Sequence, residues 1–251
     1  MVNAAAVVGR RLSPLRPMVV RLQQRRQRRA FIRKATFAAA YAGATLELQV
    51  DHGVSISPRV NLTFRPGSTN VLHIGEGTTL ADDVQILFKG GALLLGKRCD
   101  VRHNVVFNMA GRLEVGGDAI LSWGTVFHCS NTITIGRMVG IAERVTVVDS
   151  SHYFTEKEAF FYHNNRPGEI SVGDNTWLCP NSVLTRTAHV GDHCIVGSNS
   201  VVVGVVPSGH LASGVPAVLS PLSLPWEQPD GAPKAGRKQP GARRTGQRAT
   251  T

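Results

Sequence analysis

The chain has 251 residues, enough for one sizeable domain with appendages, and it is 42% hydrophobic but only 6% aromatic, so the core must be aliphatic. The net charge of +11 lies at the two ends, because residues 41–220 carry twelve basic against fifteen acidic residues. The four cysteines form no CxxC pair, which argues against a zinc cage or a redox motif and fits a reducing cytoplasm. No apolar run is long enough to span a bilayer.

Residues 1–45 are predicted to form a basic N-terminal segment with a helix over residues 18–40. This helix places Phe31, Ile32, Ala35, Ala38 and Ala39 on one apolar stripe, while residues 21–29 present charge nearly all round. An open stack of parallel strands needs protection at its edge, so we expect the helix to cap the strands that follow. The alternative is that it rests at the inner face of an anionic membrane. We expect no specific nucleic-acid partner, since charge runs at chain ends are usually solvated.

An internal repeat begins near residue 70. A β-branched or aliphatic residue followed by Gly recurs in steps of 21, 20 and 20 residues, then 37, then 18. Apolar residues fall at every sixth position within each step. These positions are Ile74, Leu80, Ile86, Leu95, Val101, Phe107, Val115, Leu121, Phe127, Ile135, Ile141, Val147, Val172, Leu178, Leu184, Val190, Val196 and Val202. A period of six matches neither a helix nor a half-buried strand.

A period of six is typical of short parallel strands joined by tight corners, with one apolar residue per strand pointing inwards. Three such strands close a triangular coil of about 18 residues, and stacked coils bury one another's faces. The repeats VGDNTW, LCPNSV, VGDHCI and VGSNSV (residues 172–201) resemble those of the hexapeptide-repeat acyltransferases. The resemblance implies an all-β fold, a left-handed parallel β-helix over residues 46–222, with a protruding loop at 149–171.

The 37-residue step contains that loop, and His152 stands at its start. Long excursions from a compact repeat are usually functional or disordered. In the family, such a loop walls an active site between neighbouring subunits of a homotrimer, and the catalytic histidine lies at its base. The resemblance therefore implies that His152 is the general base; an ordinary loop histidine is the alternative. Asp149 is a candidate to orient its ring, although a backbone carbonyl would serve equally well.

The resemblance also implies further contacts. Trp177 occupies the tryptophan position of the VGDNxW motif, which lines the acceptor and pantetheine region. Ser122 and Ser130 match the acceptor-side positions, where the galactoside branch has Asn and Asp, so a simple galactoside is not favoured. Ser198 is expected to touch the pantetheine arm. Val218, Leu219 and Ser220 follow the Gly-Val-Pro-Ala motif where relatives carry basic residues; Arg186 or the C-terminal tail would then meet the coenzyme phosphates.

Residues 223–251 are rich in Pro, Gly, Arg and Gln and are predicted to be a disordered basic tail. Taken together, the resemblance implies a cytoplasmic, homotrimeric, acetyl-CoA-dependent O-acetyltransferase. It would act on a hydroxyl of a sugar or of a polysaccharide or glycolipid precursor, without a metal ion. Two alternatives stay open: an N-acyltransferase acting on an amino sugar, and a non-catalytic β-helix scaffold that binds partners through its basic ends.

Overall fold

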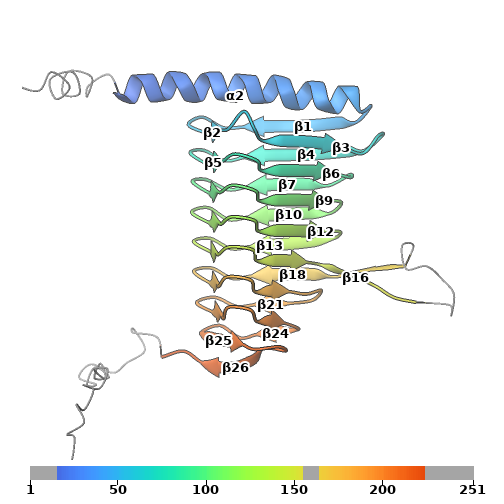
Figure 1. The fold of residues 1–251 in the computed structure, drawn as a ribbon, viewed down its shortest axis with the longest axis vertical. Coiled ribbons are helices and arrows are strands. Elements are labelled where there is room, and N and C mark those ends of the chain that lie inside the picture. Colours follow the sequence, from blue (N-terminus) through green and yellow to red (C-terminus); the bar gives the residue numbers. More distant parts are fainter. Residues whose placement is uncertain (1–15, 155–163, 224–251) are drawn as a thin grey trace, which may run out of the picture.

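A single N-terminal helix precedes a stack of short strands in the computed structural model, which describes residues 16–154 and 164–223 (Figure 1). The helix is α2 (Arg16–Tyr41). Sheet A contains β1 (Thr45–Val50), β4 (Thr69–Ile74), β7 (Ala92–Leu95), β10 (Arg112–Val115), β13 (Thr132–Ile135), β18 (Glu169–Val172), β21 (His189–Val190) and β24 (Val205–Val206).

The other two sheets of the stack are built from the strands that follow each strand of sheet A. Sheet B contains β2 (Ser55–Ile56), β5 (Thr79–Leu80), β8 (Asp100–Val101), β11 (Ile120–Leu121), β14 (Gly140–Ile141), β19 (Trp177–Leu178), β22 (Ile195–Val196), β25 (His210–Ser213) and β26 (Val218–Pro221). Sheet C contains β3 (Asn61–Phe64), β6 (Gln85–Phe88), β9 (Val106–Met109), β12 (Val126–Cys129), β15 (Thr146–Val148), β20 (Val183–Leu184) and β23 (Val201–Val202).

Each coil runs through sheets A, B and C in turn and then returns to sheet A one step further along the axis. Neighbouring strands pair in parallel and in register, as Val115 with Ile135 and Phe107 with Phe127 illustrate. Antiparallel β25 and β26 close the far end. The all-β, left-handed parallel β-helix with an N-terminal helix and a protruding loop, expected from the resemblance, is confirmed.

The core is the axial stack of inward side chains that the six-residue period predicts. All eighteen apolar repeat positions are buried, each with 3% or less of its surface exposed. Aligned side chains of successive coils touch directly: the Phe107 and Phe127 rings stack with centroids 5.4 Å apart. The four cysteines are also buried. They include Cys179 and Cys194, whose aliphatic sequence neighbours predict small buried thiols.

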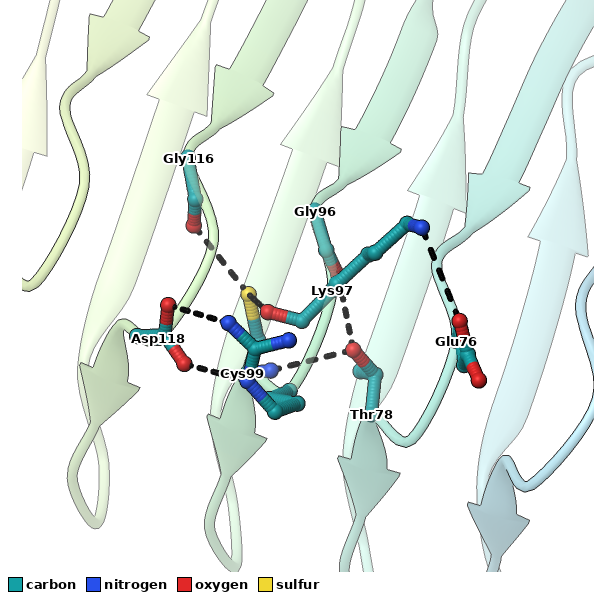
Figure 2. A network of polar contacts seen from close by, with 8 residues as sticks. Glu76, Thr78, Gly96, Lys97, Cys99, Gly116 and Asp118 are labelled. Carbon is teal, nitrogen blue, oxygen red and sulfur yellow. Dashed lines mark hydrogen bonds and ion pairs between the residues drawn. The ribbon is translucent and has the colours of Figure 1, made fainter.

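The corners between sheets A and B are held by bonds from one coil to the next (Figure 2). The Thr78 hydroxyl donates to the Gly96 carbonyl over 2.7 Å and accepts from the Cys99 amide over 3.0 Å, while the Cys99 thiol lies 3.2 Å from the Gly116 carbonyl. Towards the far end, the Thr176 hydroxyl and the Cys194 amide repeat the same arrangement. A small polar side chain at the corner therefore forms hydrogen bonds with buried backbone groups that strand pairing does not satisfy.

The recurrent glycine after each apolar residue of sheet A reflects a close approach between coils. A Cβ on Gly116 would lie 2.6 Å from the backbone of Gly136, and a Cβ on Gly96 would lie 2.7 Å from the backbone of Gly117. These contacts are with main chain, which cannot rotate away. The glycine in the Val-Gly and Ile-Gly pairs is thus required by the spacing of the coils.

Helix α2 covers the open edge of the first coil. Of its predicted apolar stripe, Phe31, Ala35 and Ala39 are buried against the prism, whereas Ile32 and Ala38 are partly exposed. Its polar side chains supply donors to unpaired carbonyls: Lys34 Nζ lies 2.7 Å from the Val60 oxygen, and Arg28 Nε donates to the Val50 oxygen over 2.7 Å. Capping is thus the observed role of its inner face. Within the described residues, no helix combines the length and the apolar character needed to cross a bilayer.

Gly116→Ala tests the close approach of the coils. The added Cβ would overlap the next coil's backbone, and such overpacking typically costs about 1–3 kcal/mol of unfolding free energy. We expect denaturant unfolding to show a loss in this range. Thr134→Ala, an outward-facing change on the next coil's β13, should stay within about 0.5 kcal/mol of the parent. Equal stability of Gly116→Ala and the parent would contradict the account of the glycines.

Candidate active site

The interruption of the repeat is a two-stranded hairpin that leaves the prism at the corner between sheets C and A. After β15, the strands β16 (Ser150–His152) and β17 (Asn165–Pro167) pair antiparallel, with His152 opposite Asn165. The chain then re-enters sheet A as β18, in register with β13. Figure 1 shows this hairpin projecting from the side of the stack, away from sheet B. The His152 side chain is exposed on it.

The root of the hairpin is fixed by Asp149, which is fully buried. One carboxylate oxygen accepts from the Ser130 amide over 2.7 Å and the other from the Asn131 amide over 2.8 Å. The Asp149 carbonyl accepts from the Gly168 amide over 2.6 Å, on the returning side of the hairpin. One residue therefore ties the outgoing segment to the preceding coil and to the returning segment.

Burial raises the pKa of the Asp149 carboxyl, and the amides of Asn131 and Ser130 oppose that rise by stabilising the charged form. Burial and the nearby carboxylate together raise the pKa of the Cys129 thiol to about 12. Because both Asp149 oxygens meet backbone donors of the preceding coil, the observed contacts give this residue a positioning role in the root. The expected hydrogen bond that the His152 ring would donate to Asp149 stays a prediction.

Ser130 and Arg186 lie at the same corner as the root. The Ser130 hydroxyl is 3.1 Å from the Ser150 hydroxyl of β16. Arg186, half-buried in the next coil, packs across Gly168, where a Cβ would fall 2.4 Å from the Arg186 Cγ atom. A glycine at 168 thus leaves room for the aliphatic part of the Arg186 side chain against the returning strand.

The remaining sequence-predicted residues lie on other sides of the prism. Trp177 is in β19 of sheet B, half exposed, and its indole lies over Gly140, 3.4 Å from where a Cβ would be. Ser122 is buried at the corner between sheets B and C and receives a hydrogen bond from Arg102 over 3.2 Å. Ser198 is exposed at the same type of corner, after β22.

The predicted site residues therefore form two groups within one chain. Asp149, Ser130, His152 and Arg186 gather at the corner between sheets C and A, whereas Trp177 belongs to sheet B, the opposite side of the triangular coil. Figure 1 shows the short strands of sheet B at one edge of the stack and the hairpin at the other. One chain does not bring these groups into a single pocket.

Sequence reasoning did not single out His128. This residue is on β12 opposite Val148, directly before the hairpin root, and its carbonyl accepts from the Asp149 amide. Its Nδ1 atom is 3.0 Å from the Asn108 amide nitrogen. Burial and the neighbouring Lys89 lower the pKa of His128, so its ring is biased towards the neutral form. The available sequence signal was its position in the repeat: His128 directly follows the inward residue Phe127 and stands two residues before Ser130.

A metal centre has no support in the described ranges 16–154 and 164–223, where no cluster of three or more His, Cys, Asp or Glu side chains is placed to hold an ion. The predicted tail after residue 223 and the tip of the loop at 155–163 fall outside the described residues.

Comparison with known proteins agrees with this architecture. A family model described as bacterial transferase hexapeptide (six repeats) matches residues 169–204. The chain is 25% identical to the galactoside O-acetyltransferase of Escherichia coli (strain K12), over 49% of this chain and 60% of that protein. It is 31% identical to the putative lipopolysaccharide biosynthesis O-acetyl transferase WbbJ of the same strain, over 34% of this chain and 48% of that protein.

Among solved structures, the polySia-specific acetyltransferase NeuO superimposes with a TM-score of 0.50 at 17% identity, covering 76% of this chain and 84% of that one, a likeness of fold. The chain spans less than two thirds of the length of the two curated relatives above. The repeat pattern, the fold and these matches agree with a resemblance to the hexapeptide-repeat acyltransferases, and the family model itself covers residues 169–204.

Asp149→Ala tests the positioning role of the buried carboxylate. It leaves the Ser130 and Asn131 amides without acceptors, and unsatisfied buried donors cost about 1–3 kcal/mol of unfolding free energy. We expect a loss in this range, together with faster amide hydrogen exchange at those two residues. Asp174→Ala is the matched control at an exposed corner, where the carboxylate caps one amide. An Asp149→Ala protein with unchanged exchange at residues 130 and 131 would contradict the assignment.

Proposed function

We propose that this protein is an acetyl-CoA-dependent O-acetyltransferase that modifies a hydroxyl of a sugar or of a polysaccharide or glycolipid precursor. The observation that carries the proposal is the hairpin: in the part of the chain that the structure describes, it is the one long interruption of the repeat. His152 stands on its strand β16, and a buried aspartate fixes its root. Both curated relatives reported above carry O-acetyltransferase names, which supports the same class of reaction.

His152 is proposed as the general base. Its neutral imidazole would take the proton from the acceptor hydroxyl as the oxygen attacks the thioester carbonyl. The carbon–oxygen bond forms, the carbon–sulfur bond breaks, and the proton passes to the departing thiolate of coenzyme A. Backbone amides near the hairpin would stabilise the oxyanion of the tetrahedral intermediate. Imidazole suits this exchange because it gains and loses a proton near neutral pH.

The site is proposed to form between two protomers of a homotrimer. His152 and Trp177 lie on opposite sides of one prism, so they meet only if the hairpin of one chain reaches sheet B of its neighbour. A threefold ring gives every chain the same heterologous contact and closes the assembly. Trp177 and Ser198 would then line the pantetheine groove, Ser122 and Ser130 the acceptor side, and Arg186 would attract the coenzyme phosphates.

The compartment proposed for this reaction is the cytoplasm. All four cysteines are buried free thiols, and such thiols persist in a reducing environment.

His152→Ala tests the base. A general base contributes about 10²–10⁴-fold to the rate, so we expect kcat to fall by that factor with the KM for acetyl-CoA nearly unchanged. The assay follows labelled acetyl-CoA with a panel of neutral and amino sugars, which also separates O- from N-transfer. His73→Ala, a partly exposed histidine paired with Glu47 in sheet A, is the control that should keep full activity.

His128→Ala completes that comparison. Loss of activity in His128→Ala with full activity in His152→Ala would move the base to the sheet C histidine. Absence of turnover in the parent protein across the panel would instead favour a scaffold.

Subunit complementation tests the shared site. His152→Ala and Trp177→Ala chains, each impaired alone, are refolded together at equal ratio. Random assembly of threefold rings leaves about a quarter of the interfaces with both residues intact, so we expect about a quarter of the parent kcat. If hairpin and tryptophan acted within one chain, every site would keep one lesion and mixing would restore nothing.

A further inference from the structure

The outer face of helix α2 carries a surface that neither the capping role nor the proposed reaction uses. This face lies opposite the buried residues Phe31, Ala35 and Ala39, and its side chains recur at helical spacings of three and four residues. We define this surface, the outer face of α2, by Met18, Val19, Leu22, Arg26, Arg29, Arg33, Phe37 and Tyr41, all of which are exposed.

Three arginines occupy the middle of this face. Arg26, Arg29 and Arg33 follow one another at spacings of three and four residues, so their side chains project in one direction. No acidic residue precedes Glu47 in the chain, and in the described residues none of the three arginines is within ion-pair distance of a carboxylate. Four arginines of the coils, Arg59, Arg98, Arg102 and Arg112, do pair with acids.

Large apolar side chains flank the arginines at both ends. Met18, Val19 and Leu22 expose about half of their surface or more, and Phe37 and Tyr41 expose 71% and 86%. Phe37 and Tyr41 lie side by side with ring centroids 6.2 Å apart. Exposed apolar groups of this size on both sides of a basic row are costly in water, and they mark a surface that binds something apolar as well as anionic.

A recess beside the helix has the same mixed character. It measures about 410 Å³ and lies between α2 and the first coil. Its walls are mainly apolar, from Ala30, Phe31, Ile56 and Pro58, and Arg26 and Lys34 stand with them. A single-stranded nucleic acid could stack bases on the exposed aromatic rings, but its phosphates and bases would not fill the apolar walls of the recess. An anionic lipid matches both chemistries, since it carries a phosphate above an acyl chain.

We propose that the outer face of α2 docks the protein on an anionic lipid bilayer. The helix lies across the end of the stack, perpendicular to its length in Figure 1, so it can rest flat on a surface while the prism stands away from it. The arginines would meet lipid phosphates, and Phe37 and Tyr41 would enter the headgroup region, as amphipathic interfacial helices do. The inner face would stay in place as the cap of the first coil.

Vesicle co-sedimentation of the 251-residue chain tests this proposal. The probes are vesicles of phosphatidylcholine alone and of phosphatidylcholine with phosphatidylglycerol. We expect binding to the anionic vesicles only. The triple variant Arg26→Gln, Arg29→Gln, Arg33→Gln should weaken it about 100-fold, because each basic residue near an anionic surface contributes about fivefold in affinity. Phe37→Ser with Tyr41→Ser should weaken it about tenfold.

The matched control removes the same charge from the coils: Arg65→Gln, Arg137→Gln, Arg144→Gln. It should bind anionic vesicles as the parent does, because its outer face of α2 is unchanged. The basic chain termini are present in every variant and therefore contribute equally to all of them. Circular dichroism and the melting temperature establish that each variant is folded. If the two triple variants weaken vesicle binding equally, the proposal is overturned. It is also overturned if the parent protein binds neither kind of vesicle. Binding of a single-stranded RNA oligonucleotide in preference to anionic vesicles, lost in the α2 triple variant, would also overturn it.

Discussion

The fold depends on the stacking of inward apolar side chains, one per six residues, along the axis of the prism. Many strands contribute only two residues, too few to be stable alone. Each coil is held by the coils above and below, through parallel backbone pairing and contacts such as the Phe107–Phe127 ring stack. The glycines of the Val-Gly and Ile-Gly pairs let the coils approach closely enough for both.

This constraint explains how the repeat can be interrupted. A departure from the stack is tolerated only where the chain leaves and re-enters at one corner, because then no coil loses its neighbour. The corner between sheets C and A meets that condition: β15 still pairs with β12 and β20, and β18 pairs with β13. Asp149 closes the gap by bonding to the preceding coil and to Gly168. The same contacts hold β16 at a fixed root, which the proposed role of His152 requires.

Much of the fold could be predicted from the sequence, because a six-residue period is visible without any knowledge of contacts. The same holds for the helix as a cap, since its apolar stripe and the open edge are both apparent. The root of the hairpin could not be predicted: the partners of Asp149 are backbone amides of residues 130 and 131, and backbone donors have no sequence signature. The packing of Arg186 across Gly168 joins residues that are close only after folding.

The separation of the candidate site residues was, in contrast, readable from the repeat. Trp177 stands beside the second apolar position of its coil, on sheet B, whereas His152 follows the third, on sheet C. Residues at different phases of a triangular repeat face different sides. The proposed reaction would use both residues only across an interface between protomers, so it depends on the proposed homotrimer.

The central claim is that the hairpin of one protomer and sheet B of another enclose a single thioester site. A crystal structure of the assembled protein soaked with coenzyme A tests it most directly. The account predicts that the sulfur lies within about 4 Å of the His152 ring of one protomer, a distance suited to proton transfer, while the pantetheine arm passes Trp177 of its neighbour. Coenzyme bound along one protomer alone, with its sulfur remote from every His152, would contradict it.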